Sequence, residues 1–427
     1  MIATLESGGP VPVGMVFPFC LLLFLIATMP FIHRHWWEAH YTKVSAVLGL
    51  LVIGYYFLVR RDGIHPLHTG VDFISFISLI GSLFVVAGGI HIRTRGESTP
   101  LRNVLFLLGA SVLSNVIGTT GASMLLIRPW VRMNKYRITG FHVVFFIFIV
   151  SNVSGCLTPI GDPPLFLGYL RGVPFFWTLE ALILPWGMAL TLLLTVFYYL
   201  DRHNFLRAPK TIRELETANE TIEFEFKSLI PLAVILGSVF ISKPLFLREV
   251  LMLVAAAYSY WRTPRPIHDA NHFSLDPIKE VAWIFFGIFS TMMPAIEYLE
   301  INAVNMGINT PTKFYLTTGV LSSVLDNAPT YLTFLGASLG LFGKSVDQYG
   351  DVIWFVQNHA IFIKAISMGA VFFGAMTYIG NGPNLMVKSI ADHAKVHTPS
   401  FFKYIFYYSI PILLPILLFV GWLFLRS

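Results

Sequence analysis

The sequence predicts an all-α polytopic membrane protein built from two inverted repeats. Three observations predict this class: the composition, the distribution of basic residues, and matched interruptions in apolar segments. Of the 427 residues, 55% are hydrophobic and only 12% are charged, which is too apolar for a protein that hides its hydrophobic surface in a water-soluble core. We therefore expect the chain to lie in a lipid bilayer, and nothing in its charge indicates binding to nucleic acid.

The crossing segments follow from hydropathy and length. A span must cover a hydrocarbon layer of about 30 Å, and the segments that meet this requirement are residues 11–32, 44–59, 71–91, 141–170, 177–200, 228–243, 246–260, 280–297, 358–390 and 404–425. The segments 103–127 and 314–342 are also apolar, but less clearly spans.

Basic residues decide how those two segments are arranged. If every apolar segment crosses once, the loop Lys and Arg residues are shared almost equally between the two sides. If 103–127 and 314–342 instead enter and return as hairpins, most basic residues fall on one side, as the positive-inside rule requires. The first hairpin then enters from the cytoplasm, the second enters from outside, and both termini are external. We expect the inner (plasma) membrane as the location.

Each half then has the same order of elements: three spans, a re-entrant hairpin, an interrupted helix and a final span. The first repeat covers residues 11–200, and the second covers residues 228–425 in the opposite orientation. Residues 201–227 carry mixed charge and are predicted to form a cytoplasmic linker. Inverted repeats of this kind are the usual architecture of secondary transporters.

The interrupted helices match each other. "LTPIGDPP" (157–164) aligns with "MTYIGNGPN" (376–384). Proline lacks an N–H group and glycine loosens the backbone, so both stretches should unwind. Unwound backbone is tolerated within a membrane only where it lines a protein-enclosed cavity or holds an ion. We also predict that a helix begins at Pro163 with Asp162 as its N-cap. The alignment pairs Thr158 with Thr377, Gly161 with Gly380, and Asp162 with Asn381.

The hairpin tips are predicted to match as well. "VLSNVIGT" (112–119) aligns with "VLDNAPTY" (324–331), which pairs Ser114 with Asp326 and Asn115 with Asn327. An ionisable group inside a membrane is energetically costly, so its presence there indicates a functional site. The alternative interpretations are that Asp162 is only a helix cap, that Asp326 is only a turn former, and that the asparagines cap local backbone groups.

Oxygen ligands of this kind suit hard cations such as sodium. The candidate cation-binding residues are Asp162, Asp326, Asn327, Asn115, Ser114, Thr158, Thr377, Asn381 and Asn384. Asp162 and Asp326 are the candidate sodium-binding carboxylates. Lys364 either extends toward the membrane surface or acts as a counter-charge. The sequence offers no metal-ligand cluster and no nucleophile with a base, so we expect no enzyme activity and no catalytic residue.

The "SN" and "LDNAPT" tips and the "TPIGDPP" and "YIGNGPN" interruptions resemble the ion-transporter superfamily. The closest likeness is to NhaD-type sodium/proton antiporters and the related citrate-transporter branch. The resemblance implies a scaffold domain, a mobile transport domain carrying both hairpins, elevator-type alternating access and a homodimer. It also implies two sodium-type sites at the hairpin tips and interruptions. Val116 after Asn115, and Asp326 in place of serine, depart from the dicarboxylate branch and weaken a tricarboxylate interpretation.

Two functions remain open from the sequence. The first is sodium or lithium exchange for protons, in which burial favours the neutral carboxyl group and protons compete with sodium. The alternative is sodium-coupled transport of citrate or another di- or tricarboxylate, which would add an organic anion to the small ions as a partner. No cofactor is expected beyond sodium and protons as transported or coupling ions.

Overall fold

The structure, a computed structural model, describes residues 11–90, 92–95, 99–207, 221–224, 229–241, 243–270 and 273–426. This part of the chain is almost entirely helical. Eight helical stretches are long and apolar enough to cross a membrane. The predicted all-α polytopic membrane class is therefore confirmed.

The first half contains helices that follow the predicted order. Its elements are η1 (Val13–Val16), α1 (Phe17–Ile32), α2 (Arg34–Gly54), the π-helix η2 (Tyr55–Val59), α3 (Ile64–Gly88), β1 (Ile92–Arg95), α4 (Pro100–Met133), α5 (Gly140–Ile149), η3 (Val153–Cys156), α6 (Pro163–Arg171) and α7 (Trp177–Arg207).

The second half repeats this order. Its elements are β2 (Thr221–Phe224), α9 (Leu229–Ser238), α10 (Leu247–Arg262), α11 (Arg265–Ala270), α12 (Asp276–Asn302), η5 (Ala303–Met306), α13 (Pro311–Ser322), α14 (Asn327–Gly340), α15 (Tyr349–Phe373), η6 (Gly374–Met376), α16 (Gly382–His393), α17 (Phe401–Tyr404), the π-helix η7 (Ile405–Leu413) and α18 (Leu414–Phe424). At 10 residues, α9 is shorter than the span predicted over 228–243.

Both predicted hairpins are present. In α4 the helix is interrupted at Gly118, whose φ of 77° is a conformation that glycine adopts without steric cost. Asn103 and Asn134 are 31 residues apart, yet their side chains are hydrogen-bonded at 2.8 Å. A straight helix would separate them by about 46 Å, so the chain reverses direction within α4. In the second hairpin, α13 packs against α14, and the rings of Phe314 and Phe334 lie 6.2 Å apart.

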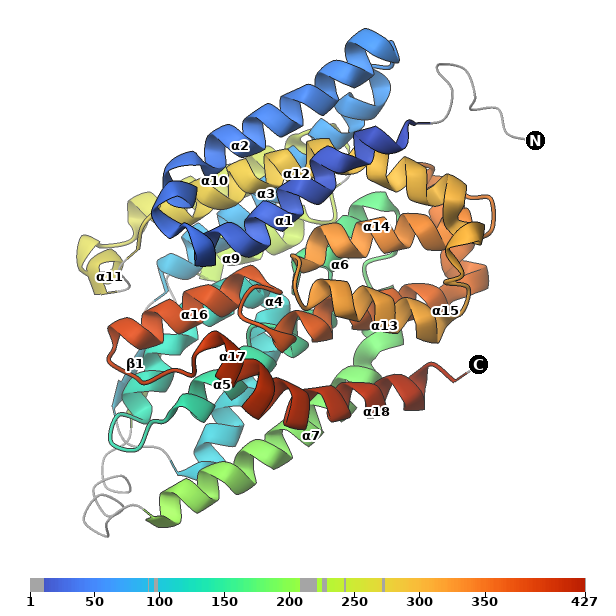
Figure 1. Cartoon of the computed structure of the whole chain (residues 1–427). Helices are drawn as coiled ribbons and strands as arrows, with labels where there is room; N and C mark the ends of the chain where they lie inside the picture. The colour runs from blue at the N-terminus through green and yellow to red at the C-terminus, as the bar shows by residue number, and fades with distance from the viewer. Residues whose placement is uncertain are drawn as a thin grey trace.

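The helices form two bundles (Figure 1). The first bundle consists of α1, α2, α3, α9, α10 and α12, and the second consists of α4–α7 and α13–α18. Within the first, α2 packs against α12 and α10 packs against α3, so the second span of each half packs against the third span of the other half. Within the second, α14 packs against α6 and α4 packs against α16. Each hairpin therefore lies beside the half-helix that follows the other half's interruption.

The segment between the two halves differs in detail from the predicted linker. Helix α7 continues to Arg207, and β2 pairs antiparallel with β1, with Ile92 opposite Phe224. This two-stranded sheet ties the segment to the loop that precedes the first hairpin. The rest of the predicted linker, residues 208–220 and 225–227, lies outside the described residues, and the boundaries of the two repeats stay a prediction.

Candidate functional site

The two interruptions meet at the centre of the second bundle. Asn381 donates from Nδ2 to Oδ1 of Asp162 at 3.3 Å, although the two residues are 219 positions apart. Both side chains are almost fully buried, with exposed fractions of 1% for Asp162 and 3% for Asn381. The aligned positions of the two motifs are therefore in direct contact.

Asp162 and Asn381 occupy the same place in their halves. Helix α6 begins at Pro163, as predicted, and α16 begins at Gly382; the preceding residues are extended, with φ of −145° and −153°. Asp162 occupies the N-cap position of α6, as predicted, but neither N-cap side chain bonds to its own helix. The reason is that the first two residues of α6 are both prolines and offer no N–H group. The carboxylate is free to bond elsewhere.

Both hairpin tips also reach Asp162. Thr119, which follows the reversal in α4, donates to Oδ1 at 2.7 Å, and Asn327, the first residue of α14, donates to Oδ2 at 2.6 Å. Asp162 is thus held by neutral donors from the two tips and from the second interruption. In the part of the chain that the structure describes, no basic side chain forms an ion pair with it. A buried carboxylate in such surroundings can bind one small cation or one proton.

Asp326, the second candidate carboxylate, lies at the tip of the second hairpin and bonds to its own helix. Its Oδ1 accepts a hydrogen bond from the backbone N–H of Ala328 at 3.0 Å, so that it caps α14. This is the geometry of the alternative interpretation, in which Asp326 forms the turn. The neighbouring residue, Asn327, supplies the contact to Asp162 instead.

Two equivalent threonines tie the interruptions to the hairpin tips. Thr158 donates from Oγ1 to the carbonyl of Asn115 at 2.6 Å and accepts from the backbone N–H of Gly161 at 3.0 Å. Thr377 donates to the carbonyl of Ser323 at 2.5 Å and accepts from the N–H of Gly380 at 3.2 Å. The pairing of Thr158 with Thr377 therefore describes equivalent contacts, and it makes Asn115 the counterpart of Ser323.

This contact corrects the predicted alignment of the hairpin tips. Asn115 was paired with Asn327, but the hydrogen bonds place "VLSNVIGT" (112–119) on "VLSSVLDN" (320–327). The predicted alignment is shifted by four residues, about one helical turn. A shift of one turn keeps apolar residues opposite apolar residues, so the pattern alone did not reveal it. With this correction Thr119 corresponds to Asn327, and both are donors to Asp162.

Glycine pairs permit the close approach of backbone within each interruption. A Cβ atom on Gly161 would lie 2.3 Å from the carbonyl oxygen of Gly155, and one on Gly380 would lie 2.6 Å from that of Gly374. Both distances are shorter than any carbon–oxygen van der Waals contact. Only glycine fits at these positions, which explains why both motifs contain it.

The other predicted residues surround the centre without contacting Asp162. Ser114 donates to the carbonyls of Ala110 and Val150, and Asn115 accepts from the N–H of Leu157. These bonds join the first hairpin to the first interruption. Lys364 is half-buried, with its Nζ 5.2 Å from the ring centre of Phe424 in α18, and it is not part of the centre.

The predicted cation-binding residues do not include two residues of the centre, Thr119 and Asn152. Asn152 donates to Asn384 at 2.7 Å and accepts from Asn381 at 3.2 Å, and so connects the two interruptions. Thr119 could have been found from the "VLSSVLDN" alignment. Asn152 had no comparable signal, because the position aligned with it in the second half is Val371.

A second buried polar cluster lies at the open end of the first hairpin. Asp201 in α7 accepts from Arg137, from Asn103 at 2.7 Å and from Nε2 of His142 at 3.0 Å. The backbone N–H of Thr139 faces Nδ1 of His142, so His142 carries its proton on Nε2. These bonds fix both ends of α4 against α5 and α7. Arg137 is buried in this cluster, with an exposed fraction of 6%.

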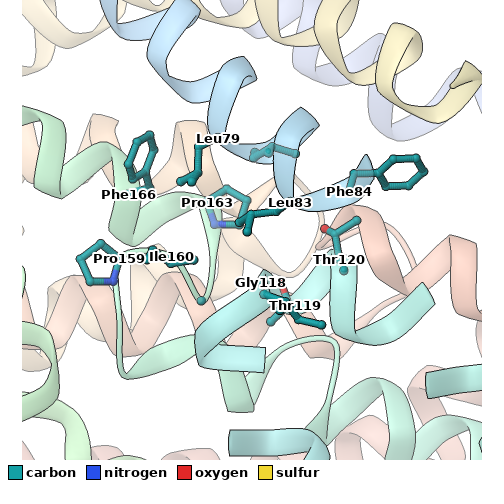
Figure 2. Close-up of a pocket in the computed structure, with 14 residues that line it drawn as sticks. Leu79, Leu83, Phe84, Gly118, Thr119, Thr120, Pro159, Ile160, Pro163 and Phe166 are labelled. Atoms are coloured by element: carbon teal, nitrogen blue, oxygen red, sulfur yellow. The ribbon is translucent and has the colours of Figure 1, made fainter. Parts of the chain in front are cut away.

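A small pocket opens between the two bundles beside the centre. Figure 2 shows Leu79, Leu83 and Phe84 of α3 facing the first hairpin tip and the first interruption. Thr119 and Thr120 supply the hydroxyl groups of its lining, and none of the described lining residues carries a charge. The pocket reaches the residues around Asp162 from the interface with the first bundle.

Comparison with known proteins supports the resemblance. A search of curated proteins found no match. A family model described as "Putative citrate transport" matches residues 9–425, which is nearly the whole chain. The fold and this match together indicate a transporter and not an enzyme. The chain, a multi-pass helical membrane protein, therefore belongs to this family of citrate-type transporters.

Proposed function

We propose that the chain is a secondary active transporter that exchanges sodium or lithium for protons at Asp162. The observation that carries this proposal is a buried carboxylate surrounded by three neutral donors, Thr119, Asn327 and Asn381. A carboxylate binds a cation when ionised and carries a proton when neutral, and burial favours the neutral form. The cation and the proton then compete for one carboxylate, as antiport requires.

Alternating access is proposed to come from movement of the second bundle against the first. The three side chains that donate hydrogen bonds to Asp162 among the described residues all belong to the second bundle, so the centre can move as a unit. The contacts between bundles involve α3 with α4 and α12 with α14. We propose elevator-type motion across this interface, a homodimer, an inner-membrane location with external termini, and exchange of external protons for internal sodium.

Transport in vesicles tests this function. The purified full chain is reconstituted with a pH gradient, and sodium or lithium is added while a pH-sensitive dye reports the gradient. We expect sodium and lithium to dissipate the gradient, and potassium to do so much less. The absence of any response from mildly acidic to mildly alkaline pH would reject the proposal.

The family description favours a second candidate, sodium-coupled uptake of citrate or a related carboxylate. The site favours it less, because a tricarboxylate would bring several negative charges next to Asp162, and the described pocket lining offers no positive charge. Uptake of radiolabelled citrate and succinate into the same vesicles, with and without sodium, separates the two functions.

A further inference from the structure

The two oxygens of Asp162 have different surroundings, and we infer that the exchanged ion binds at Oδ2, together with the side-chain oxygen of Asn327. Oδ1 would then serve only to join the two interruptions. This inference rests on the proposed function for the identity of the ion. It assigns the exchanged ion to Oδ2 of Asp162 and the side-chain oxygen of Asn327. It also makes Asn152 a positioning residue.

A relay of three amides fixes the donor at Oδ1. Asn384 donates to the carbonyls of Gly374 and Thr377 at 2.8 and 2.9 Å, so its oxygen must face Asn152. Asn152 in turn donates to the carbonyl of Ile147 at 2.8 Å as well as to Asn384. Because backbone carbonyls only accept, neither amide can turn over without losing these bonds.

The relay ends at Asp162. The oxygen of Asn152 accepts from Asn381 at 3.2 Å, and the same amino group donates to the carbonyl of Ser151 at 3.1 Å and to Oδ1 of Asp162 at 3.3 Å. The two hydrogens of this amino group are shared among the three acceptors, and the acceptors keep the nitrogen of Asn381, not its oxygen, facing Oδ1. An N–H group repels a cation and cannot accept a proton, so Oδ1 is the poorer place for either the cation or the proton.

Asn327 has no such restraint. Its side chain is fully buried, its amino group donates to Oδ2 of Asp162, and its Oδ1 has no hydrogen-bond partner among the described residues. A buried acceptor without a partner is costly. A half-turn of the amide would aim this oxygen at Oδ2 of Asp162. Carboxylate and amide oxygens together bind a hard cation, and the amide oxygen accepts equally well from a protonated carboxyl group.

The charged surroundings are compatible with this arrangement. The ionisable groups that act on Asp162 from the elements packed around it are Asp326 at the second hairpin tip and the Cys156 thiol in η3. Asp326 adds negative charge beside Asn327, which favours a cation on that side. The hydroxyl of Thr119 donates to the other carboxylate oxygen of Asp162, Oδ1.

Equilibrium binding of sodium-22 to the purified full chain tests the inference without requiring transport. Wild type, Asn327→Leu and Thr119→Val are compared at mildly alkaline pH in potassium buffer. Leu has a shape similar to Asn but offers no oxygen. We expect Asn327→Leu to weaken sodium binding by at least about tenfold, the effect of one lost interaction with a charged group, and Thr119→Val to weaken it much less. Asn327→Ser, which restores an oxygen, should recover part of the loss.

The positioning role of Asn152 has its own readout. In Asn152→Leu the amide of Asn381 loses one of the two acceptors that orient it and keeps only the carbonyl of Ser151. We therefore expect sodium binding to become less dependent on Asn327: the ratio of affinities with and without Asn327→Leu should fall. A purely structural role for Asn152 would lower affinity and leave that ratio unchanged.

The outcomes are distinct. Equal sodium binding by wild type and Asn327→Leu, or a larger loss in Thr119→Val, overturns the inference even if vesicles show exchange. No sodium binding by wild type also overturns it. Binding that depends on Asn327, in vesicles that show no exchange, supports the inference and rejects the proposed antiport. If Asn327→Leu does not give a monodisperse protein, Asn327→Ala against Thr119→Ala provides the same comparison.

Discussion

The two interrupted helices share one backbone design and carry different side chains at equivalent positions. In each, an extended residue precedes the half-helix, a threonine ties the interruption to a hairpin tip, and a glycine pair lets the backbone approach closely. The first interruption carries Asp162, whereas the second carries Asn381. The first half supplies the charge, and the second supplies two of the three donors that hold it.

This difference follows from the symmetry itself. Equivalent residues of two inverted repeats meet at the centre, so a strict repeat would place two carboxylates in contact at the 3.3 Å that separates Asp162 from Asn381. Like charges this close cannot both ionise. Replacing one by an amide removes the repulsion and gives the remaining carboxylate a donor. A single charge also fits the competition of one cation with protons.

The largest expected effect is that of removing the charge of the first interruption. In Asp162→Asn we expect sodium-dependent dissipation of the pH gradient to fall to the level of empty vesicles at every pH, because the amide neither ionises nor takes up a proton. The variant should still reconstitute, since an amide of the same shape fills the position. Exchange at the wild-type rate would place the exchanging group elsewhere.

Moving the charge to the second interruption should not restore exchange. Asn381→Asp would aim carboxylate oxygens at the carbonyl of Ser151 and the side-chain oxygen of Asn152, both of which only accept in this arrangement. We expect a loss of stability of about 3 kcal/mol, measured as a lower melting temperature in detergent. The double variant Asp162→Asn/Asn381→Asp should be inactive. Recovered exchange in the double variant would show that the two positions are interchangeable.

The half-helices also end differently. At the end of α6, Arg171 binds Asp347 and, at 2.9 Å, Asp72 of α3 in the first bundle. Near the end of α16, Lys388 pairs with Asp392, four residues later, and its Nζ lies 5.6 Å from the ring centre of Tyr378. We expect Arg171→Ala to cost about 2 kcal/mol, allowing for partial exposure of the acids, and Lys388→Ala less than about 0.5 kcal/mol.

Thermal melting of the two variants in the same detergent measures this difference. The triple variant Arg171→Ala/Asp72→Asn/Asp347→Asn should recover part of the loss, because it also neutralises the two carboxylates that pair with Arg171. Equal melting temperatures for Arg171→Ala and Lys388→Ala would remove Arg171 as a stabilising contact between them.

The sequence predicted the architecture better than the contacts of the site. Proline and glycine mark interruptions through the backbone alone, so the start at Pro163 and the match of Asp162 with Asn381 were recognisable. The hairpins were less certain, because an apolar helix repeats its pattern every turn and a shift of one turn looks equally good. Because of that ambiguity, Thr119 was not aligned with Asn327 and was not predicted as a site residue. The contacts of Asn152 could not be predicted, since its partners Asn381 and Asn384 are brought to it only by the fold.

The smallest effects should be those that the two halves share. Thr158→Val and Thr377→Val each remove a hydroxyl that donates to a hairpin-tip carbonyl and accepts a backbone N–H. We expect each to cost about 1 to 2 kcal/mol, measured by melting, with the two values close to each other. Because Thr158 lies four residues before Asp162, Thr158→Val should also reduce exchange more than Thr377→Val. If the two variants lose equal stability but unequal exchange, the backbone design is shared and the difference in exchange comes from the charge that only the first half carries. If they lose unequal stability, the backbone design itself differs between the halves.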